Sequence, residues 1–507
     1  MASVSLLGGS LASGLLLWHT AYWRAGTDLL ALPTPRRYWE DLTVAATRLL
    51  DRDGNAERVS INSAEGAELR LGFQRSLARA AAADGLAAWE FWRTVAVRPA
   101  LKGRRLLPRD SDDPGRAALL TAGFRLLGGV SPFLPLWIGA LAAVPLLPWA
   151  AWELAHAGRW VAGVLFPLVL ASSPFFVEAL SLPYSAVGFY LIGLLVLVPF
   201  ATYALAGDVR LKGLIARTVL AGSAFSICVL CRGATFLTLP GFVLALGAAT
   251  ASLGARWPFR RRALAFAAAL VLFLAPYALL RQPSHHDVWI ALWEGLGDFD
   301  RTKGHTWADS AGREVLRQAG VELPARYPIF ENASVAEPIF RRLFLNDVRS
   351  DPLWFAAILG RRAWATLTQA KLTPWAPSGG SSIATRASPN EGAIDTYYAM
   401  ATTVEWLGLG PWRFELPLLL LWGPTLLLAL VCLGGGRVRT LAPASARLRP
   451  ALAVLTTVGV GGLCFPVLFT TAGGFETQAF AIVYGLGFAF LLDEALRYRR
   501  AAGLPAG

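Results

Sequence analysis

Charged residues are scarce in this chain of 507 residues, since Asp, Glu, Lys and Arg make up 16% of it, against about 25% in soluble domains. Lysine is scarcer still, with 4 residues beside 43 arginines. Hydrophobic residues make up 55%, and the mean hydropathy is +0.47. They fall in blocks of about 16 to 24 residues, as in a protein that crosses a membrane several times. The composition excludes a disordered chain and an ordinary cytosolic enzyme.

Cysteine and the common catalytic motifs are also scarce or missing. All four cysteines fall in apolar blocks: Cys228, Cys231, Cys432 and Cys464. The long polar segments therefore have no disulfide framework, and the C-x-x-C of Cys228 and Cys231 reads as i, i+3 neighbours on a helix. No Walker loop and no G-x-S-x-G or H-E-x-x-H motif is present, so neither ATP-driven transport nor a zinc protease is supported.

Ten apolar blocks predict ten membrane spans. They lie near 3–23, 133–154, 160–177, 184–207, 218–235, 236–254, 263–280, 414–433, 451–471 and 477–492. The chain then divides into five parts. These are a first span (1–23), a polar segment (24–132), a block of six spans (133–280), a second polar segment (281–413), and three spans with a tail (414–507).

The net charge of +13 is concentrated in short loops. The segments 208–217, 255–262, 434–450 and 493–507 together carry +11 of it. Short basic loops beside spans mark the cytoplasmic side. This pattern argues against nucleic acid as a partner and predicts a protein of the cytoplasmic (inner) membrane. Both termini are then cytoplasmic, and both long polar segments are extracytoplasmic.

Amphipathic patterns predict helices inside the polar segments. Residues 37–52, 64–98 and 115–131 show helical spacing of apolar residues, and so do residues 352–371. Several of these stretches place Arg and Trp on different faces, which is typical of helices that lie at a membrane surface.

The first polar segment contains the candidate general bases. Asp28 follows the first span, and Glu40 and Asp41 lie in the first amphipathic stretch. Reduced solvation near the membrane would raise the pKa of such a carboxyl, as a general base requires. The alternative is that Glu40 and Asp41 stabilise a helix N-terminus through its dipole.

Four short motifs occur in a characteristic order along the chain. They are YWEDLTVAA (38–46), DDPGRAALLTAGFRLLGGVSPF (112–133), CRGATFLTLP (231–240) and GGFETQAF (473–480). With the pattern of spans, this order resembles the C superfamily of integral-membrane glycosyltransferases, such as protein O-mannosyltransferases and aminoarabinose transferases. In the last motif Gln478 and Ala479 stand where the family tends to have Arg and Tyr.

The resemblance implies a reaction and its participants. The donor would be a polyprenyl-phosphate-linked sugar, and the acceptor an envelope glycan, a lipid or a protein. Asp41 matches the family's catalytic acid best, with Asp28 as the alternative. No cofactor is expected, although a divalent cation remains an open alternative.

Arg232 is the candidate that binds the donor phosphate. An ionisable residue at the end of a span is costly unless it is paired or functional. A guanidinium makes bidentate contacts to phosphate oxygens, although Arg232 could also snorkel to the lipid head groups. Glu178 and Glu476 are candidate partners.

A cluster of polar residues at 284–309 predicts a substrate-binding loop. Its members are His285, His286, Asp287, Asp298, Asp300 and His305, with Glu476 as a further candidate. They suit a sugar or pyrophosphate, and their spacing matches no standard zinc site. The alternative is a turn-rich loop whose Asp and His side chains cap backbone groups.

Together these patterns predict an all-α polytopic membrane protein with a glycosyltransferase C fold. The predicted function is transfer of a sugar from a lipid-linked donor on the outer face of the membrane. Two alternatives remain open. One is a transporter or flippase of lipid or polysaccharide, and the other is a non-catalytic scaffold that retains the fold.

Overall fold

The structure is a computed structural model. It describes residues 1–501, except for 28, 30–34, 52–53, 62, 97–100, 102, 108–113, 182–186, 206–208, 254–256, 281–287, 298–302, 306–308, 322–332, 372–385, 389–399, 411, 435–441 and 470–477.

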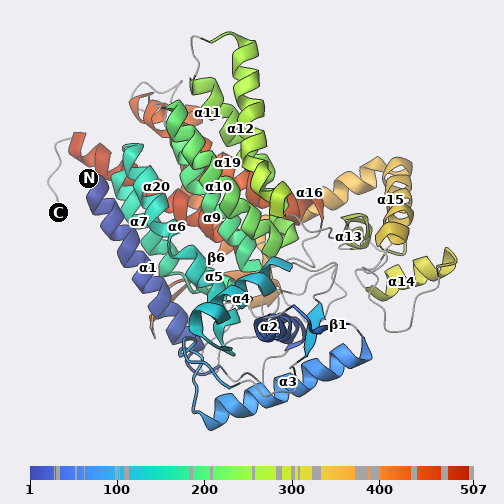
Figure 1. The fold of residues 1–507 in the computed structure, drawn as a ribbon. Coiled ribbons are helices and arrows are strands. Elements are labelled where there is room, and N and C mark those ends of the chain that lie inside the picture. Colours follow the sequence, from blue (N-terminus) through green and yellow to red (C-terminus); the bar gives the residue numbers. More distant parts are fainter. Residues whose placement is uncertain are drawn as a thin grey trace.

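A bundle of long apolar helices forms most of the molecule (Figure 1). Its members are α1 (Ala2–Arg24), α5 (Leu134–Ala143), α6 (Leu146–His156), α7 (Trp160–Ala171), α8 (Pro174–Leu180), α9 (Val187–Leu205), α10 (Leu211–Cys231), the 3-10 helix η2 (Gly233–Thr238), α11 (Leu239–Leu253), α12 (Phe259–Leu280), α17 (Leu418–Leu421), α18 (Gly423–Gly434), α19 (Ala442–Leu468) and α20 (Phe480–Ala501). The predicted helical, multi-pass membrane fold is confirmed.

The described helices account for fewer spans than the ten predicted. Seven helices among the described residues are long and apolar enough to cross a membrane, or eight if α7 and α8, bent by 67°, form one span. The predicted spans 414–433 and 477–492 fall on α18, which is short, and on α20, which carries charges near its end. The count of ten therefore stays a prediction.

Burial separates a central helix from a peripheral one. Helix α9 is apolar on all faces and almost wholly buried, as expected of a helix surrounded by others. Helix α12 is just as apolar, yet it exposes Leu264, Val271 and Leu279. Such a surface is stable only against lipid, so α12 lies at the edge of the bundle.

The first polar segment packs on one end of the bundle (Figure 1). It contains α2 (Pro35–Leu50), α3 (Ala64–Ala83), α4 (Pro114–Leu127) and a parallel strand pair, β1 (Glu57–Ser60) and β2 (Arg104–Leu107). The helix predicted over 64–98 ends at Ala83, because the chain turns at Gly85 with a φ of 59°.

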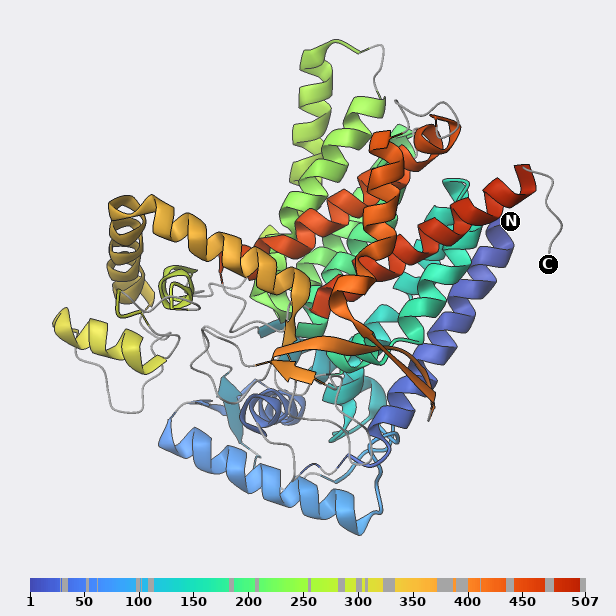
Figure 2. The ribbon, with the colours of Figure 1, turned by 180° about the vertical axis from the view of Figure 1, so that it is seen from behind.

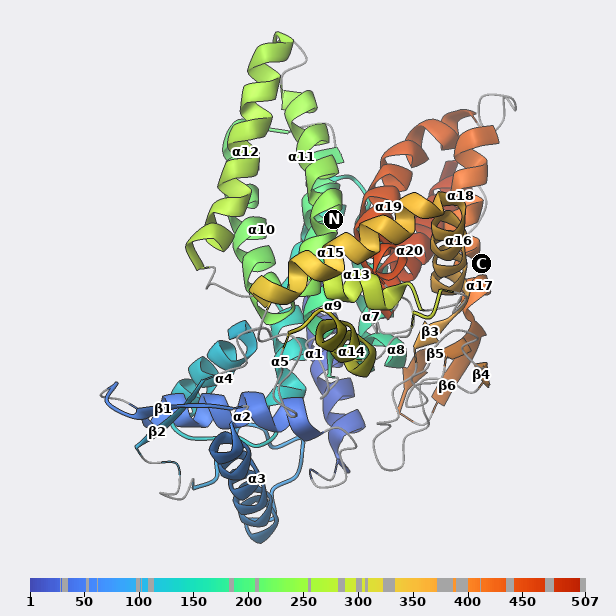
Figure 3. The same cartoon turned by 90° about the vertical axis from the view of Figure 1, so that its right-hand side faces the viewer.

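The second polar segment forms a helical unit that projects from the side of the bundle in Figure 2 and lies in front of it in Figure 3. It contains α13 (Val288–Gly295), α14 (Asp309–Gln318), α15 (Ala333–Ser350) and α16 (Pro352–Thr368), which share a hydrophobic core. Buried Arg362 links this unit to the bundle. It donates hydrogen bonds to the carbonyl oxygen of Gly295 on α13, and to those of Val467 and Leu468 on α19 at 3.3 and 2.9 Å.

A four-stranded sheet is present that the sequence analysis did not expect. It contains β3 (Ala370–Lys371), β4 (Arg386–Ser388), β5 (Met400–Leu409) and β6 (Trp412–Pro417). The hairpin of β5 and β6 lies near the end of α1 (Figure 2). The span predicted from 414 therefore begins later, because Phe414 to Pro417 pair with β5.

The start of α1 and the end of α20 lie at the end of the bundle opposite α2–α4 (Figure 1). We call this the basic end, defined by Gly158, Arg447 and Arg497, and the opposite end the polar end, defined by Asp41, Arg116 and Arg232. At the basic end Arg497 donates to the carbonyl of Gly158, so the α6–α7 turn and the end of α20 meet there.

Ion pairs to two buried carboxylates hold the basic end together. Arg159 lies 2.9 Å from Asp493 and 3.1 Å from Glu494. Arg497 lies 2.9 Å from Asp493, and Arg447 lies 2.6 Å from Glu494. Three guanidinium groups from different elements thus hold two carboxylates of α20.

Candidate functional site

Helix α2 positions Asp41 at the polar end. Its apolar residues recur at helical spacing and are fully buried, among them Tyr38, Leu42, Ala45 and Ala46. The Asp41 side chain keeps 24% of its surface exposed, and its Oδ2 lies 3.2 Å from Nη1 of Arg116, whose side chain is 4% exposed. A small molecule can therefore reach the Asp41 carboxylate, whereas the Arg116 guanidinium that holds this carboxylate is buried.

Helix α4 brings this pair to the end of α10. A Cβ at Gly115 would lie 2.7 Å from the carbonyl carbon of Leu230, so only glycine permits this approach of the two backbones. Arg116 follows Gly115 directly, and Arg232 follows Leu230 by two residues. The structure therefore brings Asp41, Arg116 and Arg232 into one region, although they are far apart in the sequence.

Arg232 interrupts the helix between two spans. Its backbone is extended, with a φ of −151° and a ψ of 101°, and it ends α10 and precedes η2. Its N–H still donates to the carbonyl of Cys228 at 2.8 Å. The side chain is partly exposed, and at the end of a span a guanidinium in this position can bind a lipid phosphate.

Two buried polar residues, Tyr38 and Arg24, lie beneath the site and hydrogen-bond to backbone carbonyls. The Tyr38 hydroxyl donates to the carbonyl of Pro132. Burial raises the pKa of Tyr38, while Arg116 and Arg24 act in the opposite direction. Arg24 is buried, donates to the carbonyl of Ser181 at 2.8 Å, and interacts electrostatically with Glu178. Arg24 and Arg116 carry no signal in the sequence that marks them as part of a site.

The other candidate bases differ in accessibility. Glu40 is buried on α2, with 7% of its surface exposed, and is less accessible than Asp41. Asp28 lies outside the described residues. Asp41 is thus the described candidate that a substrate can reach most easily.

Most of the predicted substrate-binding residues lie outside the described residues. These are His285, His286, Asp287, Asp298, Asp300 and Glu476. His305 is described and buried, with its Nε2 3.2 Å from Oδ2 of Asp347 and its ring between Trp293 and Trp354. Burial lowers its pKa, which Asp347 partly opposes. A sugar could touch His305 only if this core opened.

No group of three or more His, Cys, Asp and Glu side chains suited to a metal occurs among the described residues. Cys228 and Cys231 are both buried free thiols. The alternative of a divalent cation at 284–309 concerns mostly residues outside the described part, so it stays untested.

The chain was compared with protein-family models, with curated proteins and with solved structures. No protein-family model and no curated protein matches it. Its structure is similar over 100% of its length to the archaeal oligosaccharyltransferase AglB from Archaeoglobus fulgidus, solved in complex with an inhibitory peptide and a dolichol-phosphate. The identity is 11% and the TM-score 0.41, and the chain spans 52% of that protein. This likeness concerns the arrangement of helices, and the chemistry rests on the residues of this chain.

Proposed function

We propose that this protein transfers a sugar from a polyprenyl-phosphate-linked donor to an acceptor hydroxyl at the polar end. The observation that carries the proposal is the position of Asp41. It is a partly exposed carboxylate, fixed by buried Arg116 and brought close to Arg232 by the contact of Gly115 with Leu230. A base and a phosphate-binding guanidinium are the two groups that such a transfer needs.

In the proposed reaction Asp41 accepts the proton of the acceptor hydroxyl. The acceptor oxygen then forms a bond to the anomeric carbon of the sugar, and the bond from that carbon to the phosphate oxygen breaks. The lipid phosphate leaves with the electron pair, and Arg232 stabilises its added charge. Arg116 fixes the direction of the Asp41 carboxylate through their contact at 3.2 Å.

The same proposal assigns the polar end to the outer face of the cytoplasmic membrane. The short basic loops support this assignment through the positive-inside rule. Cysteine-accessibility labelling should then modify residues near 60 and 330 from outside, and residues near 258 and 442 only from inside. Labelling near 258 from outside would overturn the orientation.

The test of the function begins with a deletion strain, in which mass spectrometry of envelope glycans and lipid-linked sugars identifies the substrates. An accumulated donor and a missing sugar are expected. Asp41→Asn should then lower turnover by about 10²- to 10⁴-fold, the usual contribution of a general base, while donor binding persists.

Asp51→Asn is the matched control, because Asp51 also lies 3.2 Å from an arginine, Arg105, and directly follows the same helix. It should keep nearly full turnover. If Asp41→Asn restores the missing sugar as well as the wild-type protein does, then the transfer reaction at this site is refuted and the scaffold or transporter alternative is favoured.

A further inference from the structure

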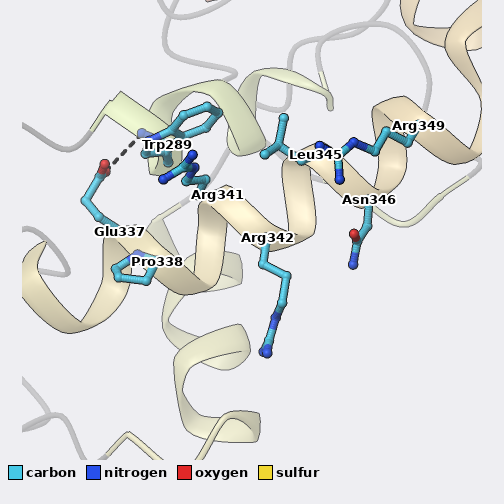
Figure 4. A pocket seen from close by; sticks show the side chains of 8 residues that line it. All are labelled: Trp289, Glu337, Pro338, Arg341, Arg342, Leu345, Asn346 and Arg349. Atoms are coloured by element: carbon cyan, nitrogen blue, oxygen red, sulfur yellow. Dashed lines mark hydrogen bonds between the residues drawn. The ribbon is translucent and has the colours of Figure 1, made fainter.

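A second basic site lies outside the polar-end site, on the helical unit of the second polar segment. A pocket with a volume of about 450 Å³ lies along α15 and the start of α13 (Figure 4). This volume falls in the usual range of small-ligand sites, roughly 300 to 1,000 Å³. The residues that matter for its chemistry are Trp289, Glu337, Arg341, Arg342, Leu345 and Arg349.

The spacing of the residues on α15 explains the pocket. Residues four apart on a helix lie one above the other. Arg341, Leu345 and Arg349 therefore form one row, and Arg342 begins a neighbouring row (Figure 4). The opposite face of α15, with Phe340 and other apolar residues, packs into the core of the unit. The arginines are thus directed outward from a rigid helix.

Three arginines and one carboxylate, that of Glu337, line the pocket, so its net charge is positive. Within the described part of the chain, Arg341, Arg342 and Arg349 make no ion pair, and all three are exposed. Asp347, an acid on the same helix, faces His305 instead. Glu337 uses its carboxylate to accept the N–H of Trp289 at 2.9 Å, at the start of α13.

Trp289 gives the pocket a fixed wall. The guanidinium carbon of Arg341 lies 5.6 Å from the centre of the Trp289 ring, within the range of a cation–π interaction. This contact limits the positions of Arg341 before any ligand arrives, so less conformational entropy is lost on binding.

The neighbouring helix has an apolar surface. On α16, Leu353 is 81% exposed and Trp364 is 62% exposed. Exposed apolar side chains beside arginines are typical of an element that rests on a bilayer, where head groups carry phosphate.

We infer that this pocket binds the phosphoryl group of an anionic ligand, with Arg341 and Arg349 as its main contacts. The ligand chemistry is a phosphate ester, whether it belongs to a membrane lipid head group or to a soluble phosphate. The site is separate from the donor phosphate assigned to Arg232, and it does not depend on the proposed transfer reaction.

The test uses the purified full chain in a neutral detergent and three probes. They are inorganic phosphate, short-chain phosphatidylglycerol and short-chain phosphatidylcholine, and binding is measured by microscale thermophoresis. Wild-type protein should bind phosphatidylglycerol more tightly than phosphatidylcholine. Binding of inorganic phosphate with similar affinity would identify a soluble ligand as the source, and weaker binding would identify a lipid.

Arg341→Gln and Arg349→Gln should each raise the Kd for the preferred probe about tenfold, since each removes a charge-assisted contact. Arg361→Gln removes an exposed arginine of α16 outside the pocket and should leave the Kd unchanged. Arg349→Lys keeps the charge but loses the bidentate geometry, so its Kd should lie between those of wild type and Arg349→Gln.

Two results would overturn the inference. One is wild-type protein that binds none of the anionic probes. The other is an equal loss in Arg361→Gln and in the pocket variants, which would indicate general charge attraction. Helical content measured by circular dichroism checks that each variant is folded, and because all these side chains are exposed we expect no change in it.

Discussion

The basic end and the polar end use the same ion-pair chemistry in different surroundings. At the basic end, the side chains of Asp493 and Arg159 are 0% and 9% exposed, and further arginines complete the cluster. At the polar end, Arg116 is just as buried, but the Asp41 side chain is 24% exposed. Burial of both partners makes the first cluster a structural joint, whereas exposure of one carboxylate leaves the second open to a substrate.

The largest effect is expected from Arg159→Ala. It removes the cation between Asp493 and Glu494 and leaves buried carboxylates without one of their partners, which typically costs about 3–5 kcal/mol. The thermal unfolding temperature in detergent should fall markedly. Arg260→Ala, at an exposed position on α12, should not change it, and equal unfolding temperatures for the two variants would contradict the assignment of a structural joint.

Two aspartates, Asp41 within α2 and Asp51 directly after it, sharpen the comparison. The Asp51 side chain is 3% exposed and accepts the N–H of Ala56 at 3.2 Å, so Asp51→Asn should cost about 1–3 kcal/mol. Asp41→Asn should cost a similar amount, because it leaves the buried guanidinium of Arg116 without its carboxylate partner. Chemical unfolding measures both, and the two variants should differ in lost turnover far more than in stability.

A smaller effect is expected from the pH. Burial lowers the pKa of His305 below its ordinary value of 6.5, so the unfolded chain binds a proton more readily than the folded one. The stability contributed by neutral His305 is then complete above pH 6.5 and is lost as the pH falls. His305→Gln should flatten the dependence of the unfolding temperature between pH 7.5 and 5. An unchanged slope would argue against this residue as the titrating group.

The smallest effect is expected from a fully exposed pair. Glu314 and Arg317 lie 2.5 Å apart on α14, and hydrogen bonds from Arg317 and Gln318 lower the pKa of Glu314 to about 2. Solvent screens this pair and the side chains lose entropy to form it. Glu314→Ala should therefore leave the unfolding temperature unchanged. A clear drop would show that the exposure of an ion pair does not predict its contribution to stability.

Local patterns predicted much of the fold. Apolar blocks gave the positions of the long helices, because a run of apolar residues is local information. The sheet was missed even though Trp412, Phe414 and Leu416 alternate with Arg413 and Glu415, the period of a strand. The apolar residues that follow in α17 and α18 concealed this signal, so the stretch read as the start of a span.

The site could be predicted only in part. Asp41 and Arg232 stood out as a charged residue in a family-like motif and as a charge at the end of a span. Arg116, which fixes Asp41, could not be assigned, since the sequence contains 43 arginines and the pairing depends on how α4 crosses α2 and α10. Long-range contacts of this kind depend on packing, which the sequence does not display.

Arg362 has a mechanical consequence for the helical unit of the second polar segment. A single side chain joins the last turn of α19 to the end of α13, and Gly295 approaches Phe469 so closely that no side chain would fit between them. The position of this unit is therefore set by the position of the end of α19. Arg341 and Arg349, whose helix packs into the core of this unit, therefore hold a fixed position relative to the end of α19.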